Sequence, residues 1–456
     1  MHKIALALAF VATGVSFIAL KLGETLHIES PMLIVTIMCL PAALLGLVSW
    51  FATDSFARSR FVVLCVALAW VGLLYGAERQ NYRGLLNVAY LSSTLFVGAL
   101  IVESRCWWFC ARILVLASTL AMGIAMWFQY QDQGFAMLYQ LHRFGRLLND
   151  EGTMKLANPN VVGGQLAFAA VLAFVLHLQS GRQANQNVAV AARPRRFSLC
   201  WTVLLSLGCI LTASRGAFVA WSGGLGLLVL GGMKDQRFSK LRDLVAVSGV
   251  LFLLLMLTTV ATECTPWQTL QTRLNDETSV VTASGRVMIW KSALDMWRMD
   301  PRRILLGTGT GAAPEVFGEY LLSNDTTDTL IRRTIDTHNA YVEWGLSFGL
   351  VGMAAGIGLF VVVIRKARQL DRQDGNVYRQ AILLCSGLAS MTYVTYYHLF
   401  LIASGGLMLS MLSQPRPVVA VVRHRGPRNK TSSSGTGPHA PTSRPGRLKT
   451  ALGPVS

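Results

Sequence analysis

The chain has 456 residues, of which 53% are hydrophobic and only 14% are charged, whereas an average soluble domain carries about 25% charged residues. This composition excludes a mainly water-soluble protein. The 41 Lys and Arg against 23 Asp and Glu give a formal net charge of +18, which in a soluble chain would indicate a nucleic-acid partner.

Apolar runs long enough to cross a bilayer recur along most of the chain. A helix needs about 20 apolar residues to span roughly 30 Å of hydrocarbon. The sequence therefore predicts an all-α, polytopic membrane bundle of about 12 spans, within a range of ten to twelve because two pairs of runs have almost no connection between them. The predicted spans are 4–20, 32–52, 61–77, 84–102, 107–129, 161–179, 197–213, 216–233, 242–262, 340–363, 380–396 and 397–412.

The distribution of Lys and Arg predicts the orientation of these spans, because cytoplasmic loops carry an excess of them. With the N-terminus in the cytoplasm, seventeen Lys and Arg fall in inner loops and seven in the short outer loops. The first run fits a retained signal anchor better than a cleavable signal peptide, since no clear cleavage site precedes Lys21. The surplus of +18 thus reflects membrane topology and does not indicate nucleic acid.

The topology divides the chain into three predicted regions. The spans make up a transmembrane domain, 1–412. The longest outer segment, 263–339, is expected to form a helical loop domain between the ninth and tenth spans. The tail 413–456 carries eight Lys and Arg, no acidic residue, and a stretch rich in Ser, Gly and Pro. Such a composition cannot bury a core, so we predict a disordered basic tail in the cytoplasm.

The outer segment before the sixth span holds three cations, Arg143, Arg146 and Lys155. Cations on this side run against the usual charge distribution. That distribution is compatible with an ordinary basic loop or with a site for an anion. Asn160, at the start of the sixth span, suits a helix N-cap, and the N-terminus of a helix attracts anions.

The connection between the seventh and eighth spans is the short segment 212–216, Thr-Ala-Ser-Arg-Gly. It is expected to place Arg215 at the outer membrane surface, where lipid phosphates or a lipid-linked diphosphate would lie. Arg215 is then either an interfacial arginine that reaches the headgroups or part of a functional site. The scarcity of cations in the other short outer loops favours the functional interpretation.

Arg286 ends a Ser-Gly-Arg segment and directly precedes a predicted amphipathic helix. The apolar stripe of this helix is expected to contain Val287, Trp290, Leu294 and Trp297. The helix either lies in the outer interface, with its tryptophans among the headgroups, or packs onto the top of the bundle. In both cases Arg286 sits just before the helix N-terminus.

The glycine-rich segment 307–311 resembles a phosphate loop only superficially, because no Lys-Ser or Lys-Thr follows it and no strand–turn–helix unit surrounds it. We predict a turn there. Asp276 and Glu277 form the acidic pair of the outer loop domain that best suits a metal ion, but no further carboxylate stands at a fitting spacing. The sequence accordingly predicts no metal and no other cofactor.

His338 and Asn339 immediately precede the tenth span. Asn339 suits the N-cap of that helix. The positive end of the helix disfavours protonation of His338, which leaves a neutral imidazole able to accept a proton. A single histidine at a helix start more often has a structural role, but three cationic groups are predicted on the same outer face, which favours a functional one.

Arginines together with a neutral histidine at a membrane surface suit one kind of reaction. A sugar attached to a lipid diphosphate has an anionic leaving group, whose growing charge is stabilised by fixed guanidinium groups without a metal. Attack on the anomeric carbon by an acceptor hydroxyl needs a general base, a role that fits His338. The residues therefore predict glycosyl transfer from a polyprenyl-diphosphate donor.

In their order along the chain, five of these segments resemble motifs of the O-antigen ligase and O-antigen polymerase superfamily, over roughly residues 140–365. Asn339 is followed, after nine residues, by Gly-Leu-Val-Gly at 349–352, which is similar to the signature associated with the ligases rather than the polymerases. The five matching segments are 158–160, 212–216, 284–286, 307–311 and 338–339.

The resemblance implies a GT-C-like enzyme of lipopolysaccharide biosynthesis in the bacterial inner membrane. Such an enzyme transfers O-antigen polysaccharide from undecaprenyl diphosphate to the lipid A–core oligosaccharide on the periplasmic side, with inversion and without a metal. Carried over by motif, Arg215 and Arg286 would hold the diphosphate and His338 would activate the core-sugar hydroxyl. Glu343, one helical turn after Asn339, is a candidate for orienting His338 or the acceptor. Local chemistry adds the diphosphate-binding candidates Arg143, Arg146 and Lys155 and the supporting residues Asn160 and Asn339.

Three alternatives stay open at this stage. An O-antigen polymerase would use a lipid-linked repeat unit as acceptor, and a protein-directed oligosaccharyltransferase would use a protein. A transporter of an anionic or lipid-linked substrate would also need many spans and arginines, but transporters place their sites near the bilayer midplane. The mid-span positions of this chain are nearly free of charge, which favours an enzyme that acts at the outer boundary.

Overall fold

The computed structural model describes the region from Trp107 to Met391 with several gaps, and its regular structure in that region is helical, with no strand. This confirms the all-α class for the described part of the chain. The predicted spans 4–20, 32–52, 61–77, 84–102 and 397–412 and the tail 413–456 lie outside it. The described residues are 107–134, 159–184, 192–231, 234–262, 289–309, 312–323, 337 and 339–391.

Seven long helices match the seven predicted apolar runs between residues 107 and 396. Two of them contain stretches long and apolar enough to cross a membrane, Ala111–Gln131 and Pro159–Ser180, and two shorter apolar helices are Phe197–Leu211 and Arg215–Leu230. The total of about 12 spans therefore stays a prediction. The helices are α6 (Trp107–Gln133), α7 (Pro159–Ala184), α8 (Ala192–Leu211), α9 (Arg215–Leu230), α10 (Lys234–Thr262), α13 (Pro301–Leu306), α14 (Ala313–Ser323), α15 (Ala340–Gln373) and α16 (Tyr378–Ser390).

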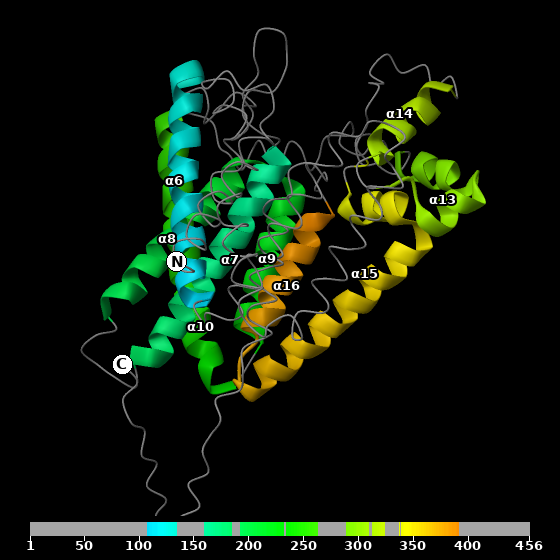
Figure 1. The fold of residues 1–456 in the computed structure, drawn as a ribbon. Helices are drawn as coiled ribbons and strands as arrows, with labels where there is room; N and C mark the ends of the chain where they lie inside the picture. The colour runs from blue at the N-terminus through cyan, green and yellow to red at the C-terminus, as the bar shows by residue number, and fades with distance from the viewer. Residues whose placement is uncertain are drawn as a thin grey trace, which may run out of the picture. The chain divides into compact units, whose positions relative to one another are not determined.

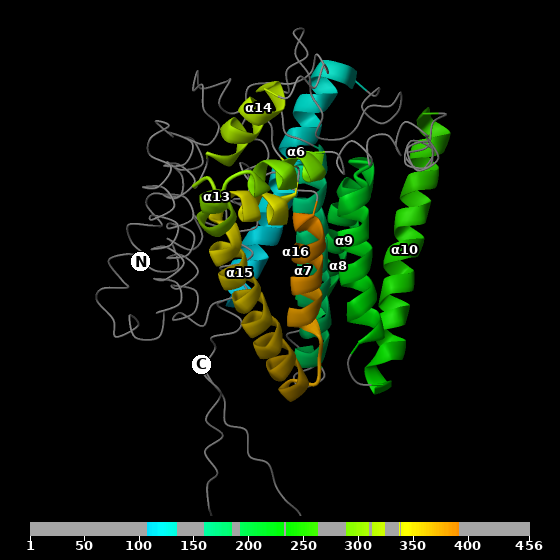
Figure 2. The ribbon, with the colours of Figure 1, turned by 90° about the vertical axis from the view of Figure 1, so that its right-hand side faces the viewer.

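Helix α7 forms the centre of the bundle. Every residue from Val161 to His177 is buried, and the helix packs against α6, α8, α9 and α16 (Figures 1 and 2). A helix that is apolar all round belongs inside a bundle, since no face of it suits water. Helix α10 packs mainly on α8 and α9 and exposes apolar side chains such as Phe252 and Leu253, a surface that suits lipid.

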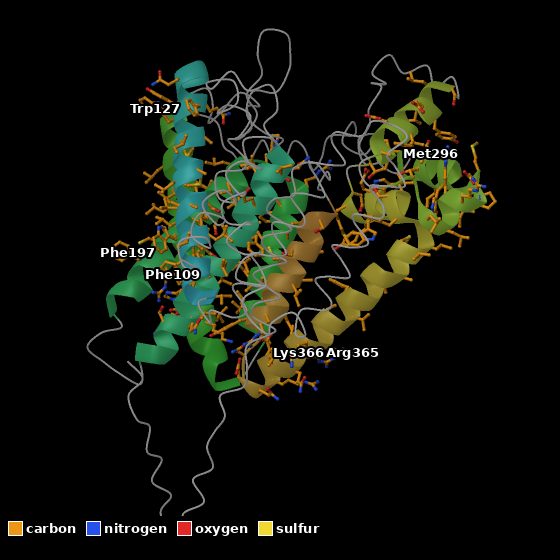
Figure 3. All side chains as sticks on the ribbon, in the orientation of Figure 1. Phe109, Trp127, Phe197, Met296, Arg365 and Lys366 are labelled. Carbon is orange, nitrogen blue, oxygen red and sulfur yellow. The ribbon has the colours of Figure 1, made fainter. Side chains whose placement is uncertain are left out.

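The helices from α6 to α10 alternate in direction, as do the long part of α15 and α16, so their ends lie at two opposite ends of the bundle (Figures 1 and 2). At one end the start of α7 meets the start of α9, and the start of α15 meets the last turn of α16. At the other end the C-terminal part of α7 meets the N-terminal part of α10. We call these the site end and the basic end. Figure 3 shows Arg365 and Lys366 toward the basic end of α15, far from Met296.

The predicted span 340–363 differs from the structure at its start. Gly349 has non-helical φ and ψ of 61° and −161°, which divides α15 into a short first part, 340–348, and a long second part, 350–373. Figure 1 shows the two parts running in different directions, with the first beside α13. A positive φ is easy for glycine and costly for other residues, so the break falls at Gly349.

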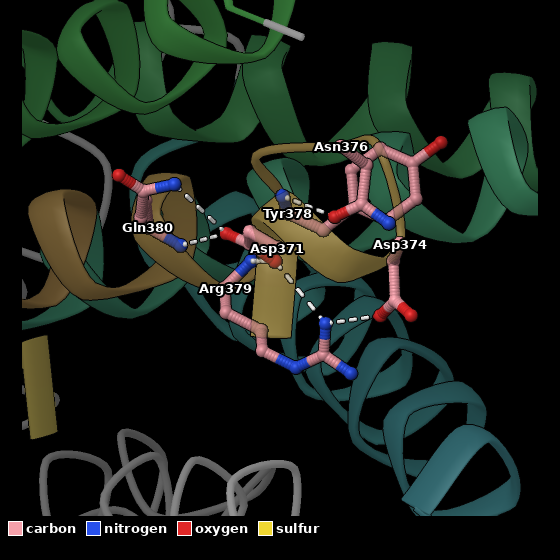
Figure 4. A network of polar contacts seen from close by, with 6 residues as sticks. All are labelled: Asp371, Asp374, Asn376, Tyr378, Arg379 and Gln380. Atoms are coloured by element: carbon pink, nitrogen blue, oxygen red, sulfur yellow. Dashed lines mark hydrogen bonds and ion pairs between the residues drawn. The ribbon is translucent and has the colours of Figure 1, made fainter. Parts of the chain in front are cut away.

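A buried carboxylate joins α15 to α16 at the basic end (Figure 4). Asp371 is fully buried and accepts hydrogen bonds from the backbone N–H groups of Arg379 and Gln380, in the first turn of α16. The Arg379 guanidinium bonds to both Asp371 and Asp374. Burial raises the pKa of the Asp371 carboxyl, and the hydrogen bonds from Gln380 and Arg379 oppose that rise. The network thereby fixes the orientation of the first turn of α16 relative to the end of α15.

Candidate active site

Arg215 is the first residue of α9 and is exposed. Ser214 caps the helix, since its side chain accepts a hydrogen bond from the Ala217 N–H. The preceding residue, Ala213, has a φ of 47°, a conformation that non-glycine residues seldom adopt outside tight turns. The turn therefore directs the chain sharply from α8 into α9, with Arg215 at the positive end of a helix.

The two motifs around Asn160 and Arg215 come together at the site end. The Ser214 hydroxyl donates a hydrogen bond of 2.9 Å to Asn160 Oδ1. One turn further along α7, a Cβ on Gly163 would lie 2.6 Å from Thr212 Oγ1, so the two backbones approach closely only because this residue is glycine. A contact between segments 54 residues apart in sequence is what a shared site requires.

The predicted N-cap role of Asn160 is wrong. Helix α7 begins at Pro159, because proline has a fixed φ that suits the first helical position and lacks an N–H that would need a partner there. Asn160 therefore lies inside the first turn. Its side chain bonds to Ser214 instead, which links the helix start to the Arg215 turn.

The residues on both sides of His338 are buried, and their side chains form hydrogen bonds within the protein. Thr337 is 1% exposed and Asn339 is 8% exposed. Asn339 caps α15, with its Oδ1 accepting hydrogen bonds from the N–H groups of Tyr341 and Val342 at 2.9 and 3.4 Å, as predicted. His338 itself lies outside the described residues. Its two neighbours nevertheless locate this segment at the site end, at the N-terminus of α15.

Glu343 contacts the residue that precedes His338. Its carboxylate is 3% exposed and accepts a 3.0 Å hydrogen bond from Thr337 Oγ1. Glu343 is the acidic residue in the first turn of α15, where the helix dipole stabilises negative charge. Asn339 and Glu343 are thus brought together, and both act on the short segment that carries His338.

The helical residues 289–298 pack onto the protein. Ala293 and Met296 are fully buried in a cluster with Phe317 of α14 and Leu346 of α15. This agrees with the packing alternative for the helix after Arg286. The predicted apolar stripe is wrong at Leu294, which is 43% exposed, because the neighbouring cluster covers the face of Ala293 and Met296.

The glycine-rich segment forms the predicted turn where it is described, at Gly307–Gly309. Thr308 N–H donates to Leu346 O at 2.7 Å, and Gly309 N–H donates to Ser347 O at 3.0 Å. A Cβ on Gly349 would lie 2.4 Å from Leu305 O. The turn therefore packs directly on the break in α15, and its N–H groups satisfy carbonyls that the broken helix leaves free.

Only part of the predicted site lies among the described residues. Arg215, Asn160, Asn339 and Glu343 are described, and no group of three metal-ligating side chains occurs in the described ranges. Two positions that the sequence analysis did not single out, Ser214 and Thr337, connect these residues. Ser214 and Thr337 directly precede Arg215 and His338 in the sequence, but which groups their hydroxyls bond to depends on the fold. The predicted site residues outside the description are Arg143, Arg146, Lys155, Arg286 and His338.

The fold and this site define a helical protein with apolar helices suited to a membrane and a polar site at one end of the bundle. A comparison with protein families adds the particular family. Residues 200–357 match the family described as O-antigen ligase. The match runs from α8 into α15 and includes Arg215, Arg286 and His338. No curated protein matches the chain.

The family match confirms the resemblance predicted from the motifs for the part of the chain that it covers. It indicates a glycosyltransferase of the O-antigen ligase type. Asn160 lies before the matched residues and is joined to them by its hydrogen bond to Ser214.

Proposed function

We propose that the protein transfers O-antigen polysaccharide from undecaprenyl diphosphate to lipid A–core oligosaccharide, at the periplasmic face of the bacterial inner membrane. The family match over residues 200–357 carries this proposal. The contacts at the site end support it, because the Arg215 turn and the segment around His338 belong to helix starts at the same end of the bundle. The basic residues on α15 lie at the opposite end, as expected for a cytoplasmic face.

In this proposal Arg215 and Arg286 bind the diphosphate, with Arg143, Arg146 and Lys155 contributing further positive charge. As the bond between the anomeric carbon and the diphosphate breaks, negative charge grows on the leaving oxygen. Guanidinium groups held in place stabilise that charge in the transition state more than in the ground state, which is what raises the rate. Undecaprenyl diphosphate leaves with the bonding electron pair.

His338 accepts the proton of the attacking core-sugar hydroxyl while the new glycosidic bond forms. Attack from the face opposite the diphosphate inverts the anomeric configuration. A position just before the N-terminus of α15 favours the neutral imidazole that a base needs. Glu343 supports this role through Thr337, whose hydroxyl bonds to its carboxylate, and Asn339 supports it by capping the helix.

A purified reaction tests the proposal. The full-length protein in lipid nanodiscs is supplied with lipid-linked polysaccharide and lipid A–core, and joined product is measured in the presence of EDTA. We expect product, because the proposed mechanism uses arginines rather than a metal. Activity that depends on an added divalent cation would contradict this part of the mechanism.

Two substitutions of His338 test its role. His338→Ala is expected to lower turnover by about 10²–10⁴-fold, the usual contribution of a general base. His338→Gln keeps a hydrogen-bonding side chain without a basic nitrogen, so it should be equally inactive. Substantial activity of the glutamine variant would show that His338 positions the acceptor instead of taking its proton.

Deletion of the gene separates the ligase from the related reactions. Loss of a ligase leaves long lipid-linked polymer together with bare lipopolysaccharide core. Loss of a polymerase instead yields core that carries single repeat units, and loss of a protein-directed transferase leaves lipopolysaccharide unchanged. We expect the first phenotype.

A further inference from the structure

The short segment that carries His338 is tied to the rest of the protein from both flanks. On one side Trp290 Nε1–H donates a 2.9 Å hydrogen bond to Thr337 O. On the other, the Tyr341 hydroxyl donates a 2.9 Å hydrogen bond to Gly387 O. Both donors stand at the tips of large, rigid rings, and both acceptors are backbone carbonyls. Each bond therefore sets a distance between two pieces of backbone.

The Trp290 bond connects the His338 segment to the helical residues that follow Arg286, one of the two predicted diphosphate-binding arginines. Trp290 lies four residues after Arg286 in the chain. Its helical segment, 289–298, is held by the burial of Ala293 and Met296 against α14 and α15. Because that segment is anchored, the bond to Thr337 fixes the His338 segment relative to the element that directly follows Arg286.

The Tyr341 bond connects the His338 segment to α16, which packs on the helix that begins at Arg215, the other predicted diphosphate-binding arginine. Gly387 lies in α16, which packs along α9, the helix that begins at Arg215. The packing is close: a Cβ on Gly223 of α9 would lie 2.9 Å from the Leu388 side chain. The bond from Tyr341 therefore fixes the His338 segment relative to α9.

We propose that Trp290 and Tyr341 are positioning residues, which hold the His338 segment in register with the helical residues that follow Arg286 and with α9, which begins at Arg215. The inference rests on the proposed function. A base and the groups that hold a leaving group must be placed together, since a misplacement of about 1 Å costs on the order of 100-fold in rate. The Trp290 bond joins one side of the segment to the helical residues that follow Arg286. The Tyr341 bond joins the other side to α16, which packs on α9, the helix that begins at Arg215.

Trp297 provides a matched control within the same helical segment. Its Nε1–H also donates to a backbone carbonyl, that of Arg303 at 2.6 Å. Arg303 lies in α13 and is the basic residue of its last turn, and the bond makes no connection to the His338 segment. Trp290→Phe and Trp297→Phe remove the same donor from the same kind of bond, so they separate positioning from general stability.

The test compares four full-length proteins in lipid nanodiscs: wild type, Trp290→Phe, Tyr341→Phe and Trp297→Phe. Turnover, KM for the lipid-linked polysaccharide, and the pH dependence of the rate are measured for each. Trp290→Phe and Tyr341→Phe are expected to lower kcat by about 10–100-fold while KM stays within about twofold of wild type. Trp297→Phe should keep kcat within about twofold, because its bond lies away from the base.

The pH profile distinguishes misplacement from a smaller folded fraction. A base that is displaced from the helix start meets a different electrostatic environment, so the acid limb of the rate profile shifts. A smaller folded fraction lowers the rate equally at every pH. The shift in Trp290→Phe and Tyr341→Phe, absent in Trp297→Phe, is the expected result.

Two outcomes overturn the inference, and they can be told apart. If wild type forms product but Trp290→Phe and Tyr341→Phe keep its kcat or lose rate uniformly across pH, the positioning role is wrong and the proposed function stands. If wild type forms no product from lipid A–core and lipid-linked polysaccharide, the proposed function is wrong, and the positioning role is overturned with it.

Discussion

The two ends of the helix bundle are held together by different chemistry. At the basic end, the buried Asp371 pairs with the largely buried Arg379, and the buried His177 contacts Asp243 at 3.1 Å. At the site end, the contacts described above use mainly hydroxyl, amide and indole groups, several of them to backbone atoms, and the buried Glu343 carboxylate accepts from an uncharged hydroxyl. Within the described residues, Arg215 is exposed and takes part in no ion pair at its end of the bundle.

This difference indicates that the basic end mainly stabilises the helix packing and that the site end is suited to binding an anionic ligand. Removing one member of a buried ion pair leaves a buried charge without compensation, so such pairs are costly to break. They suit an end whose task is to fix helices in place. An end that binds a diphosphate needs cations that are not already neutralised by carboxylates. Substitutions at the two ends should therefore affect different properties.

The largest expected effect is on activity at the site end. Arg215→Ala should lower turnover by about 10²–10³-fold, since one preorganised charge on the leaving group is lost, while the thermal midpoint of unfolding stays close to wild type because the side chain is exposed. Arg365→Ala, an exposed arginine toward the basic end, is the control. Equal loss of turnover in both variants would show that the arginine at the site end has no special role.

The break in α15 is expected to give the largest effect on stability. Gly349→Ala puts a side chain at a φ of 61° and within 2.4 Å of Leu305 O, which should cost about 2–4 kcal/mol of unfolding free energy. Gly358→Ala, in the same helix with open space around the added Cβ, should be neutral or stabilising. Thermal unfolding in detergent compares the two, and similar midpoints would contradict the role of the break.

The basic end is tested by its buried carboxylate. Asp371→Asn keeps the shape of the side chain but loses its charge and one acceptor oxygen, so we expect a loss of about 1–3 kcal/mol in stability. Turnover per folded molecule should change little, because the network lies at the end opposite Arg215. Asp374→Asn removes only the more exposed partner of Arg379 and should cost less than about 1 kcal/mol. A turnover defect in folded Asp371→Asn would argue against the separation of the two ends.

The smallest effect is expected at the junction of α7 and α9. Ser214→Ala removes the helix cap and the bond to Asn160, which should cost about 0.5–2 kcal/mol and lower turnover a few-fold as the Arg215 turn loosens. Ser222→Ala, further along the same helix, serves as the control. If both variants behave alike in melting and activity assays, the Asn160–Ser214 contact has no part in holding Arg215.

Local sequence patterns were sufficient to predict where the long helices lie and where some of them begin or end. Apolar runs predicted both ends of α6, α7, α8 and α9 to within about five residues, and they predicted the end of α10. The start of α10 was wrong, because the helix begins at Lys234 and the predicted run begins at 242. Runs locate helices because the length of hydrocarbon to be crossed and the burial of apolar surface both act on contiguous residues. The cap at Asn339 was also predictable, since its partners are two and three residues away. Asn160 shows the limit, because a proline at the preceding position starts the helix one residue earlier.

The sequence by itself determined the helical class, the family resemblance and the residue types available for chemistry. Only the tertiary structure decided how they meet. The break at Gly349 depends on Thr308 and Gly309, whose N–H groups bond to Leu346 and Ser347, and the link from Asn160 to Ser214 spans 54 residues. Such contacts form between segments that packing brings together, and the residue pattern within one segment does not specify which distant segment it will contact.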